Sequence, residues 1–589
     1  MCGIAGFMAL EGAAADEAAV ARMIDALAHR GPDGDGSYSS QNVAFAHNRL
    51  SIIDFNTGDQ PFDDKDGAAL IVNGEIYNYV ELRANHPKLE FTTQSDCETP
   101  LRLYPEKGID VAADLRGMYA FALHDRRDNS LLLARDPFGI KPLYYVEAET
   151  GLAFASEPQA LIRGGFAKAG DLSERSLREL LSLQFTTGRE TVYQGIKRLL
   201  PGETIRVRAG RIVERRNISA ITTSRAPQFN NEDAALDALD KALMDSVMVH
   251  QRADVPYGMF LSGGIDSSAL LAAMARLNER PVRAFTAGFS EGAAHDERSH
   301  ARIVAEAAGA KHIEVEFSEQ DFFSLLPRVA AALDDPVADY ATLPTYKLGQ
   351  KAREEGLKVV LCGEGGDELF AGYGRYRSAT RPWWRGGAKA MRARSVLERL
   401  DLLREPPHGW RDGIAAAEHL ARRADWSALQ QVQAVDCAEW LPNDLLIKLD
   451  RCLMAHGVEG RTPLLDPAVA EVAFALPDNF KVRGRTGKWL LRKWLDEKLP
   501  AARAFEPKRG FTVPVGIWIN RHGAKLGPLV AAQAGVSELC PPDRVRGIFT
   551  QAGKHQNFAA WILLFYALWH QVHILGHAHE GDVFECLAA

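Results

Sequence analysis

The serine-rich segment 260–268, which reads FLSGGIDSS, is the first stretch whose residue types could do chemistry. The mostly apolar run 255–261 predicts a buried strand before it, and 269–274 predicts a helix after it. A glycine-rich turn between a strand and a helix points backbone N–H groups at a phosphate, and the helix N-terminus adds partial positive charge. The absence of a following Gly-Lys-Ser/Thr excludes a Walker loop. A plain turn capped by serine is the alternative.

The second such stretch is 362–370, which reads CGEGGDELF. Its glycines allow close backbone approach, and Glu364, Asp367 and Glu368 place three carboxylates together. These carboxylates would repel a triphosphate unless Mg²⁺ intervenes, and Mg²⁺ prefers a few carboxylates plus phosphate oxygens. We therefore expect Asp266 and Asp367 to meet a Mg²⁺–pyrophosphate unit. Glu368 could instead be an acid that is favoured by the dipole at a helix N-terminus.

A third centre is Cys2. We expect Met1 to be removed, because the residue after it is small, and this would leave Cys2 with a free α-amino group. A terminal cysteine carries both a nucleophile and a base, since an α-amine with a normal pKa of about 7.7–8.0 can take the thiol proton. Taken alone this signal is weak, because a chain can begin Met-Cys by chance.

Strands and helices alternate in the second half of the chain and must position the two phosphate-facing stretches. Strands are predicted at 281–289, 311–317 and 358–361, and helices at 233–251 and from 296 to 308. This alternation predicts a parallel sheet with helices on both faces, where ligands bind beyond the carboxyl ends of the strands. Both stretches lie there.

The first two hundred residues have a different pattern. The apolar runs 68–72 and 131–134 suit buried strands of a two-layer sheet, and 173–183 predicts a helix. The polar segment 216–233 has little periodicity, and we expect it to be the linker between domains at 2–215 and 234–589. A chain of 589 residues is long enough for two or more domains.

Composition is ordinary for a globular protein, with 46% hydrophobic and 25% charged residues. The net charge of −8 gives no footprint for nucleic acid. Seven scattered cysteines without a CxxC pair favour reduced thiols in a cytoplasmic protein over disulfides or zinc. The N-terminus does not have a signal-peptide pattern. The apolar run 561–569 is too short to span a bilayer, so we expect a buried helix and no membrane association.

Six motifs appear in order in the first 150 residues, and together they resemble class II glutamine amidotransferase domains. They are Met1–Gly6 (MCGIAG), His29–Gly34 (HRGPDG), Arg49–Asp54 (RLSIID), Asn73–Asn78 (NGEIYN), Ser95–Glu98 (SDCE) and Arg135–Tyr144 (RDPFGIKPLY). The resemblance covers residues 2 to 200. It implies the αββα sandwich of N-terminal-nucleophile hydrolases and an attack by Cys2 on glutamine.

The resemblance also implies roles for the neighbours of Cys2. Asn73 and Gly74 would donate to the oxyanion, and such donors are each worth about 10²–10³ in rate. Glutamine would be bound by its α-carboxylate at Arg49 and by its α-ammonium at Asp96, with Ile53 and the Glu75 main chain nearby. Each residue has a structural alternative: a surface salt bridge for Arg49, a turn for Asp96, and a hairpin turn for Asn-Gly.

The second half resembles the asparagine synthetase family, whose ATP pyrophosphatase domain carries a Ser-Gly-Gly-x-Asp-Ser loop. Further matches are Asp334-Asp335-Pro336, Leu343–Tyr346 (LPTY), Lys448–Arg451 (KLDR), Met454–Asp466 (MAHGVEGRTPLLD) and Lys488–Arg492 (KWLLR). The resemblance implies a Rossmann-like parallel-sheet domain with a helical carboxyl-terminal region, hence an α+β domain followed by an α/β domain. A homodimer is also implied.

Site roles in this half follow from the same resemblance. Leu261 and Ala287 would contact adenosine, and Glu364 would act in acyl-adenylate formation and ammonia attack. Lys488 would lie near the α-phosphate, where a fixed cation offsets the charge of the transition state. A nucleotide would also be bound by Ser262, Gly263, Gly264, Asp266, Ser267, Cys362 and Gly363. Asp450, Arg451 and His456 are read instead as a buried polar network.

Three departures from the family pattern bear on the identity of the acceptor more than on the use of ATP or glutamine. Cys362 and Gly366 stand where the family often has serine, and 506–514 resembles a branch associated with polysaccharide or secondary-metabolite pathways. We expect an ATP- and Mg²⁺-dependent amidation that uses glutamine, most simply of aspartate to asparagine, with ammonia passing through an interior tunnel. The alternatives are another carboxylate acceptor, such as a sugar acid or a peptide side chain, and a protein that keeps the folds without the synthesis.

Overall fold

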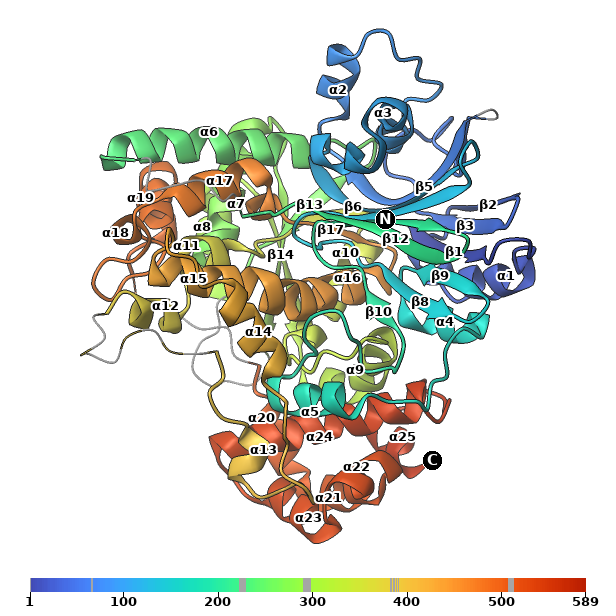
Figure 1. The fold of residues 1–589 in the computed structure, drawn as a ribbon. Coiled ribbons are helices and arrows are strands. Elements are labelled where there is room, and N and C mark those ends of the chain that lie inside the picture. The colour runs from blue at the N-terminus through green and yellow to red at the C-terminus, as the bar shows by residue number, and fades with distance from the viewer. Residues whose placement is uncertain are drawn as a thin grey trace.

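The computed structural model describes residues 2–64, 67–221, 229–289, 298–381, 384, 387, 389, 391–506 and 513–589. In its amino-terminal half two six-stranded antiparallel sheets face each other (Figure 1). The first sheet has the order β10-β8-β9-β1-β3-β2, with bounds Lys197–Arg198, Tyr144–Ala148, Gly151–Ala155, Gly3–Ala9, Val43–Arg49 and Gly34–Ser40. The second has the order β12-β11-β7-β6-β5-β4, with bounds Arg211–Asn217, Glu203–Arg208, Ser130–Arg135, Gly117–Asp125, Ala68–Ile76 and Phe62–Asp63.

Strand β5 shows how the sequence builds these layers. Successive side chains of a strand point to opposite faces. Ala69 and Ile71 enter the core between the sheets, while Leu70 and Val72 pack under helix α3 (Thr99–Lys107) on the outer side. Because both faces are covered, the strand is apolar along most of its length instead of alternating. Helices α1 (Glu17–Asp25) and α4 (Pro158–Gly164) cover the other sheet, which completes the expected αββα sandwich.

The second half contains a five-stranded parallel sheet with the order β15-β14-β13-β16-β17. Its strands are Lys311–Phe317, Arg283–Phe289, Tyr257–Phe260, Val359–Leu361 and Glu459–Arg461. The helices around it include α6 (Glu232–His250), α7 (Ile265–Leu277), α8 (Arg298–Ala307) and α10 (Thr342–Glu354). The predicted strands and helices are therefore present. The expected start of α8 at 296, and residues 222–228 of the expected linker, lie outside the described residues.

The carboxyl-terminal region is helical and surrounds α24 (Lys554–His573), as the red helices in Figure 1 show. Every residue from 561 to 569 is buried, which confirms the expected buried helix. α24 packs on α9 (Glu319–Ala332), and the indole N–H groups of Trp561 and Trp569 donate to the carbonyl oxygens of Ala338 and Leu333 at 2.7 and 3.0 Å. Among the described helices none is long and apolar enough to cross a bilayer.

Buried ion pairs join the two halves. Arg30 of the sandwich donates to both carboxylate oxygens of Asp450 at 2.8 and 3.1 Å. Arg198 donates to Asp335 in the same two-pronged way, at 2.9 and 2.7 Å, with both side chains at most 2% exposed. Removing two charges from water to form such a pair costs free energy. Removing one partner later is also costly, because the other charge stays buried without a counter-charge. They hold the halves in one orientation.

We expect Asp335→Ala to lower the free energy of unfolding by about 3–5 kcal/mol, because it leaves the buried Arg198 guanidinium unpaired. Asp425→Ala is the matched control, since Asp425 pairs with Arg423 through two similar bonds of 3.1 and 3.2 Å at the surface. Urea denaturation followed by tryptophan fluorescence compares the midpoints. A midpoint for Asp335→Ala equal to that of the control would contradict the role of the buried pair.

Candidate functional site: a nucleotide cavity and a buried thiol

A cavity of about 380 Å³ opens beyond the carboxyl ends of β13, β14 and β16, where a parallel sheet binds its ligands. It collects residues that are far apart in the sequence. Every residue expected to touch the nucleotide or the metal lines it: Leu261, Ser262, Gly263, Gly264, Asp266, Ser267, Ala287, Cys362, Gly363, Glu364, Asp367 and Lys488. This cavity, which we call the nucleotide cavity, therefore brings together the serine-rich segment 260–268 and the acidic segment 362–370.

The serine-rich segment is a compact turn that leads into α7. Gly263 adopts a φ of +73°, which side chains rarely tolerate, and Gly264 is the N-cap of the helix. The Ser267 hydroxyl accepts a hydrogen bond from the Ser262 backbone N–H at 3.2 Å and lies 3.1 Å from the Ser262 hydroxyl. The turn thus orders its own hydroxyls at the N-terminus of a thirteen-residue helix, a position suited to phosphate oxygens.

Glycines in and just after the acidic segment 362–370 leave room for the carboxylates of Asp266 and Asp367. A Cβ atom at Gly366 would lie 2.4 Å from Oδ1 of Asp266, and one at Gly372 would lie 1.7 Å from Oδ1 of Asp367. The glycine at position 366, a departure from the serine that the family often has, therefore fits the position of the Asp266 carboxylate here. A serine at this position would require Asp266 to move.

Lys488 lies between the two aspartates that were expected to bind the metal. Its ammonium group contacts Oδ2 of Asp266 and lies 2.6 Å from Oδ1 of Asp367. Burial lowers the pKa of Lys488, but the two carboxylates raise it more, so that it is raised overall. The backbone of Lys488 is left-handed, with φ 55° and ψ 35°, an uncommon conformation for a side-chain-bearing residue. Two carboxylates that converge beside a turn suited to phosphate oxygens match the oxygen ligands that Mg²⁺ prefers.

Several residues of the cavity were not expected from single motifs. Tyr373 donates a hydrogen bond of 2.7 Å to Glu368, and Lys448 pairs with Asp339 at 2.8 Å. Burial raises the pKa of Glu364, and burial together with Asp367 raises the pKa of Glu368 to about 7. The KLDR motif had marked Lys448 without a role. Only the fold shows that its side chain reaches this cavity.

Cys2 is buried in the sandwich directly before the first residue of β1, and its backbone contacts β5. The Cys2 backbone N–H donates to Oδ1 of Asn73 at 3.1 Å, and the amide nitrogen of Asn73 is buried without a hydrogen-bond partner among the described residues. A buried, unused donor is what a developing oxyanion needs. Burial raises the pKa of the thiol, so its proton requires a nearby base.

The expected glutamine-binding residues lie on elements next to β1 and β5, since Arg49 ends β3, which pairs with β1, and Asp96 contacts β5. The Arg49 guanidinium donates to Asp59 at 2.6 Å and to the Ile53 carbonyl at 3.3 Å, so Arg49 and Ile53 are in contact. Asp96 accepts a hydrogen bond from the Ile76 backbone N–H at 2.7 Å, and burial raises its pKa to about 6. A buried carboxylate held by neutral donors suits an incoming ammonium group.

Two structural interpretations need correction. Asn73-Gly74 is not a hairpin turn, because both residues lie inside β5, and Gly74 has a φ of +154° with the Met118 carbonyl only 2.1 Å from where a Cβ would be. His456 is not part of the polar network of Asp450 and Arg451. Its ring packs against Tyr346, with centroids 4.3 Å apart, and its Nε2 is buried without a hydrogen-bond partner in the described part of the chain.

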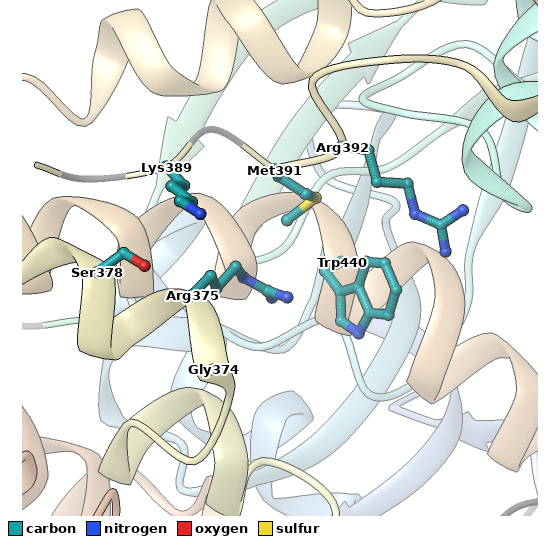
Figure 2. A pocket seen from close by; sticks show the side chains of 7 residues that line it. All are labelled: Gly374, Arg375, Ser378, Lys389, Met391, Arg392 and Trp440. Atoms are coloured by element: carbon teal, nitrogen blue, oxygen red, sulfur yellow. The ribbon is translucent and has the colours of Figure 1, made fainter. Parts of the chain in front are cut away.

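A second cavity, of about 390 Å³, is lined by the side chains that Figure 2 shows. The Arg375 guanidinium lies 4.5 Å from the ring centroid of Tyr373, whose side chain lines the nucleotide cavity, and pairs with Asp436 at 2.7 Å. In Figure 2 Arg392 lies beside the Trp440 indole. The lining residues described by the structure are Gly374, Arg375, Ser378, Lys389, Met391, Arg392 and Trp440. This lining is basic.

The pKa of Glu368 predicts a pH dependence of stability. Because the folded pKa of about 7 exceeds the unfolded value of about 4.3, the native state holds this proton more tightly, and the contribution of Glu368 to stability is lost as pH rises from about 4.3 to 7. We expect Glu368→Gln, which still accepts from Tyr373, to gain stability over the wild type between pH 5 and pH 8. Urea midpoints at the two pH values measure the difference. If the urea midpoints of the wild type and the variant differed by the same amount at both pH values, Glu368 would not titrate in this range.

Comparison with known proteins is consistent with this geometry. The family model described as "Asparagine synthase" matches residues 238–571, and "Glutamine amidotransferase domain" matches residues 1–217. A putative asparagine synthetase (glutamine-hydrolyzing) of Mycobacterium tuberculosis is 35% identical over 98% of this chain and 97% of its own length. Asparagine synthetase (glutamine-hydrolyzing) 1 of Bacillus subtilis is 32% identical over the same shares.

A relative with another name is also found. "Amidase chry2" of Gibberella zeae is 30% identical over 66% of this chain and 57% of its own length. The expected branch segment 506–514 falls largely outside the described residues, so the structure does not bear on it. From the two family models and the near-complete alignment with synthetases, the chain belongs to the asparagine synthase family and joins its synthase domain to a glutamine amidotransferase domain, as in carbon–nitrogen ligases that take nitrogen from glutamine.

Proposed function

We propose that this enzyme converts L-aspartate to L-asparagine with ammonia that it releases from glutamine, and that ATP is consumed to AMP and diphosphate. The observation that carries the proposal is the nucleotide cavity, in which Lys488, Asp266 and Asp367 converge on a serine-rich turn. The domain division at about residues 2–215 and 234–589 is part of the same proposal.

In the glutaminase half, the Cys2 thiolate attacks the side-chain carbonyl carbon of glutamine. The carbonyl oxygen becomes an oxyanion, which the Asn73 side-chain amide and the Gly74 backbone N–H stabilise. The amide nitrogen takes up the proton that the thiol gave to the base and leaves as ammonia, and water then hydrolyses the thioester to glutamate. Removal of Met1 would provide the Cys2 α-amine as the base for the buried thiol. Arg49 would pair with the α-carboxylate of glutamine and Asp96 with its α-ammonium group.

In the synthetase half, the acceptor carboxylate attacks the α-phosphorus of ATP, and diphosphate leaves. Lys488 offsets charge on the transferring phosphoryl group, and the serine-rich turn holds the departing phosphates. Asp266 and Asp367 would hold Mg²⁺, which neutralises phosphate charge when bound. The resulting acyl-AMP is a good electrophile, so ammonia that arrives through the protein interior displaces AMP to form the amide. Glu364, which lines the cavity and whose pKa is raised by burial, would accept the proton from the attacking ammonia.

A second acceptor class is favoured by one observation. The basic cavity of Figure 2 adjoins the nucleotide cavity through the stacked Arg375 and Tyr373 side chains, and aspartate does not need such a space. A larger acid, such as a sugar carboxylate or a peptide, could place a further anionic group there. The amidase name of one relative is compatible with this alternative.

Incubation with ATP, Mg²⁺, glutamine and a panel of carboxylates tests the acceptor. We expect aspartate to give AMP, diphosphate and asparagine in equal amounts, with sugar acids and peptides giving none above background. ADP as the spent nucleotide would contradict the adenylate. Preference for a larger acid, lost in Lys389→Ala but not in Lys525→Ala on the distant helix α21 (Gly523–Ala532), would establish the alternative.

Reciprocal variants test the division of labour. Cys2→Ala removes the nucleophile, so we expect glutamine-dependent product to vanish while ammonia-dependent product remains. Asp266→Asn should reduce diphosphate release by at least about 10²-fold, since it weakens the metal and lysine contacts, while glutamine hydrolysis remains. Diphosphate release and glutamate release are measured for each of the two variants. If each variant lost both activities equally, the two sites would not be separate.

A further inference from the structure

Arg461 links the two reactive halves through its side chain. It lies at the end of β17 in the synthetase half and is fully buried. Its Nη2 lies 3.2 Å from Oε2 of Glu75 in the glutaminase half, and its Nε donates to Glu459 at 2.6 Å. Its Nη1 donates to the His250 and Arg252 carbonyl oxygens at 2.8 and 2.7 Å. The guanidinium therefore has one orientation, and that orientation points to Glu75.

The backbone of the same residue touches the nucleotide segment. The Cys362 N–H donates to the Arg461 carbonyl oxygen at 2.8 Å, directly after the last paired residues of β16 and β17. Cys362, Gly363 and Glu364 line the nucleotide cavity. A movement of this segment on nucleotide binding would therefore act on the backbone of the residue whose side chain holds Glu75.

Glu75 follows Asn73 and Gly74 on β5. Burial and the nearby Asp96 raise the pKa of Glu75 well above its usual range, and Arg461 offsets part of this rise by favouring the ionised form. Glu75 and Glu459 also act on the Cys2 thiol, since both carboxylates raise the thiol pKa. A rigid strand would pass a displacement of Glu75 on to its neighbours Asn73 and Gly74. Stabilisation of the oxyanion requires these donors to be placed to within about 1 Å.

We infer that Arg461 is a positioning residue for glutamine hydrolysis, supplied by the synthetase half, which holds the Asn73-Gly74 strand in register through Glu75 and links it to the nucleotide segment. This inference rests on the proposed function. It differs from a purely structural ion pair in two consequences. Loss of the contact should lower kcat for glutamine more than it raises KM, and it should remove any response of that rate to nucleotide.

Arg461→Lys tests it, because lysine keeps the charge but loses the planar fork that contacts four groups at once. We expect kcat for glutamine hydrolysis to fall by about 10- to 100-fold, a fraction of the oxyanion effect, with KM changed by less than about 3-fold. ATP with Mg²⁺ should alter kcat/KM for glutamine in the wild type and leave it unaltered in the variant. Ammonia-dependent AMP formation should remain within about 3-fold.

Arg116→Lys is the matched control. Arg116 also crosses between the halves, with Asp466 at 2.8 Å and Asp245 at 2.6 Å, but lies in neither site. We expect it to keep the wild-type kcat and nucleotide response. If Arg461→Lys does not fold, Glu75→Gln takes its place, since it keeps the shape and removes the charge that Arg461 pairs.

The outcomes separate the inference from the proposed function. A wild type that neither hydrolyses glutamine nor forms AMP overturns the proposed function. With both activities present, an Arg461→Lys enzyme of wild-type kcat overturns the positioning role, and so does an equal loss in Arg116→Lys. A wild-type glutaminase rate that does not change with ATP overturns the link to the nucleotide segment.

Discussion

The pairing of buried arginines with carboxylates across the boundary between the two halves is the constraint on which the structure depends. Arg30 with Asp450, Arg198 with Asp335, and Arg461 with Glu75 each take one partner from either half. Removing such charges from water is expensive, and their attraction repays the cost only when the geometry is good. These pairs therefore select one docking of the halves rather than adding much net stability.

This boundary also determines the electrostatics of both reaction centres. Lys141 of the sandwich donates to the Gly460 carbonyl oxygen at 3.4 Å. Burial and Glu364 raise the pKa of Cys362, and Lys141 offsets part of that rise, so a charge from one half acts on a residue of the other cavity. In the opposite direction Glu459 acts on Cys2. Because a low-dielectric interior screens charges weakly, each site reflects the charges that the other half contributes.

Within the nucleotide cavity, compact packing and charge balance support each other. Asp266 and Asp367 approach because glycines at 366 and 372 leave room, and Lys488 neutralises the repulsion that would otherwise separate them. The left-handed backbone of Lys488 directs its side chain into this space. The arrangement is ready for phosphate oxygens and a divalent cation, which would share the same carboxylates and lysine.

The sequence by itself determined the order of the two domains, several strands of both halves and the segments that line the nucleotide cavity. These features follow from local rules: an apolar run in β5, which is buried on both faces, a strand–turn–helix around Gly263, and apolar positions on all sides of α24. The expectation that Lys488 and Asp266 act together needed the family resemblance, because 222 residues separate them.

Tertiary structure alone decided which distant groups meet. Asn73-Gly74 has the sequence of a turn, yet it lies in mid-strand, because β6 and β5 pair along its whole length and leave no room for a side chain at Gly74. The contact of Arg461 with Glu75, and the place of Lys448 in the cavity, have no local sequence signal. Ion pairs across a domain boundary depend on how two folded bodies dock, and the spacing of residues along a chain does not encode that docking.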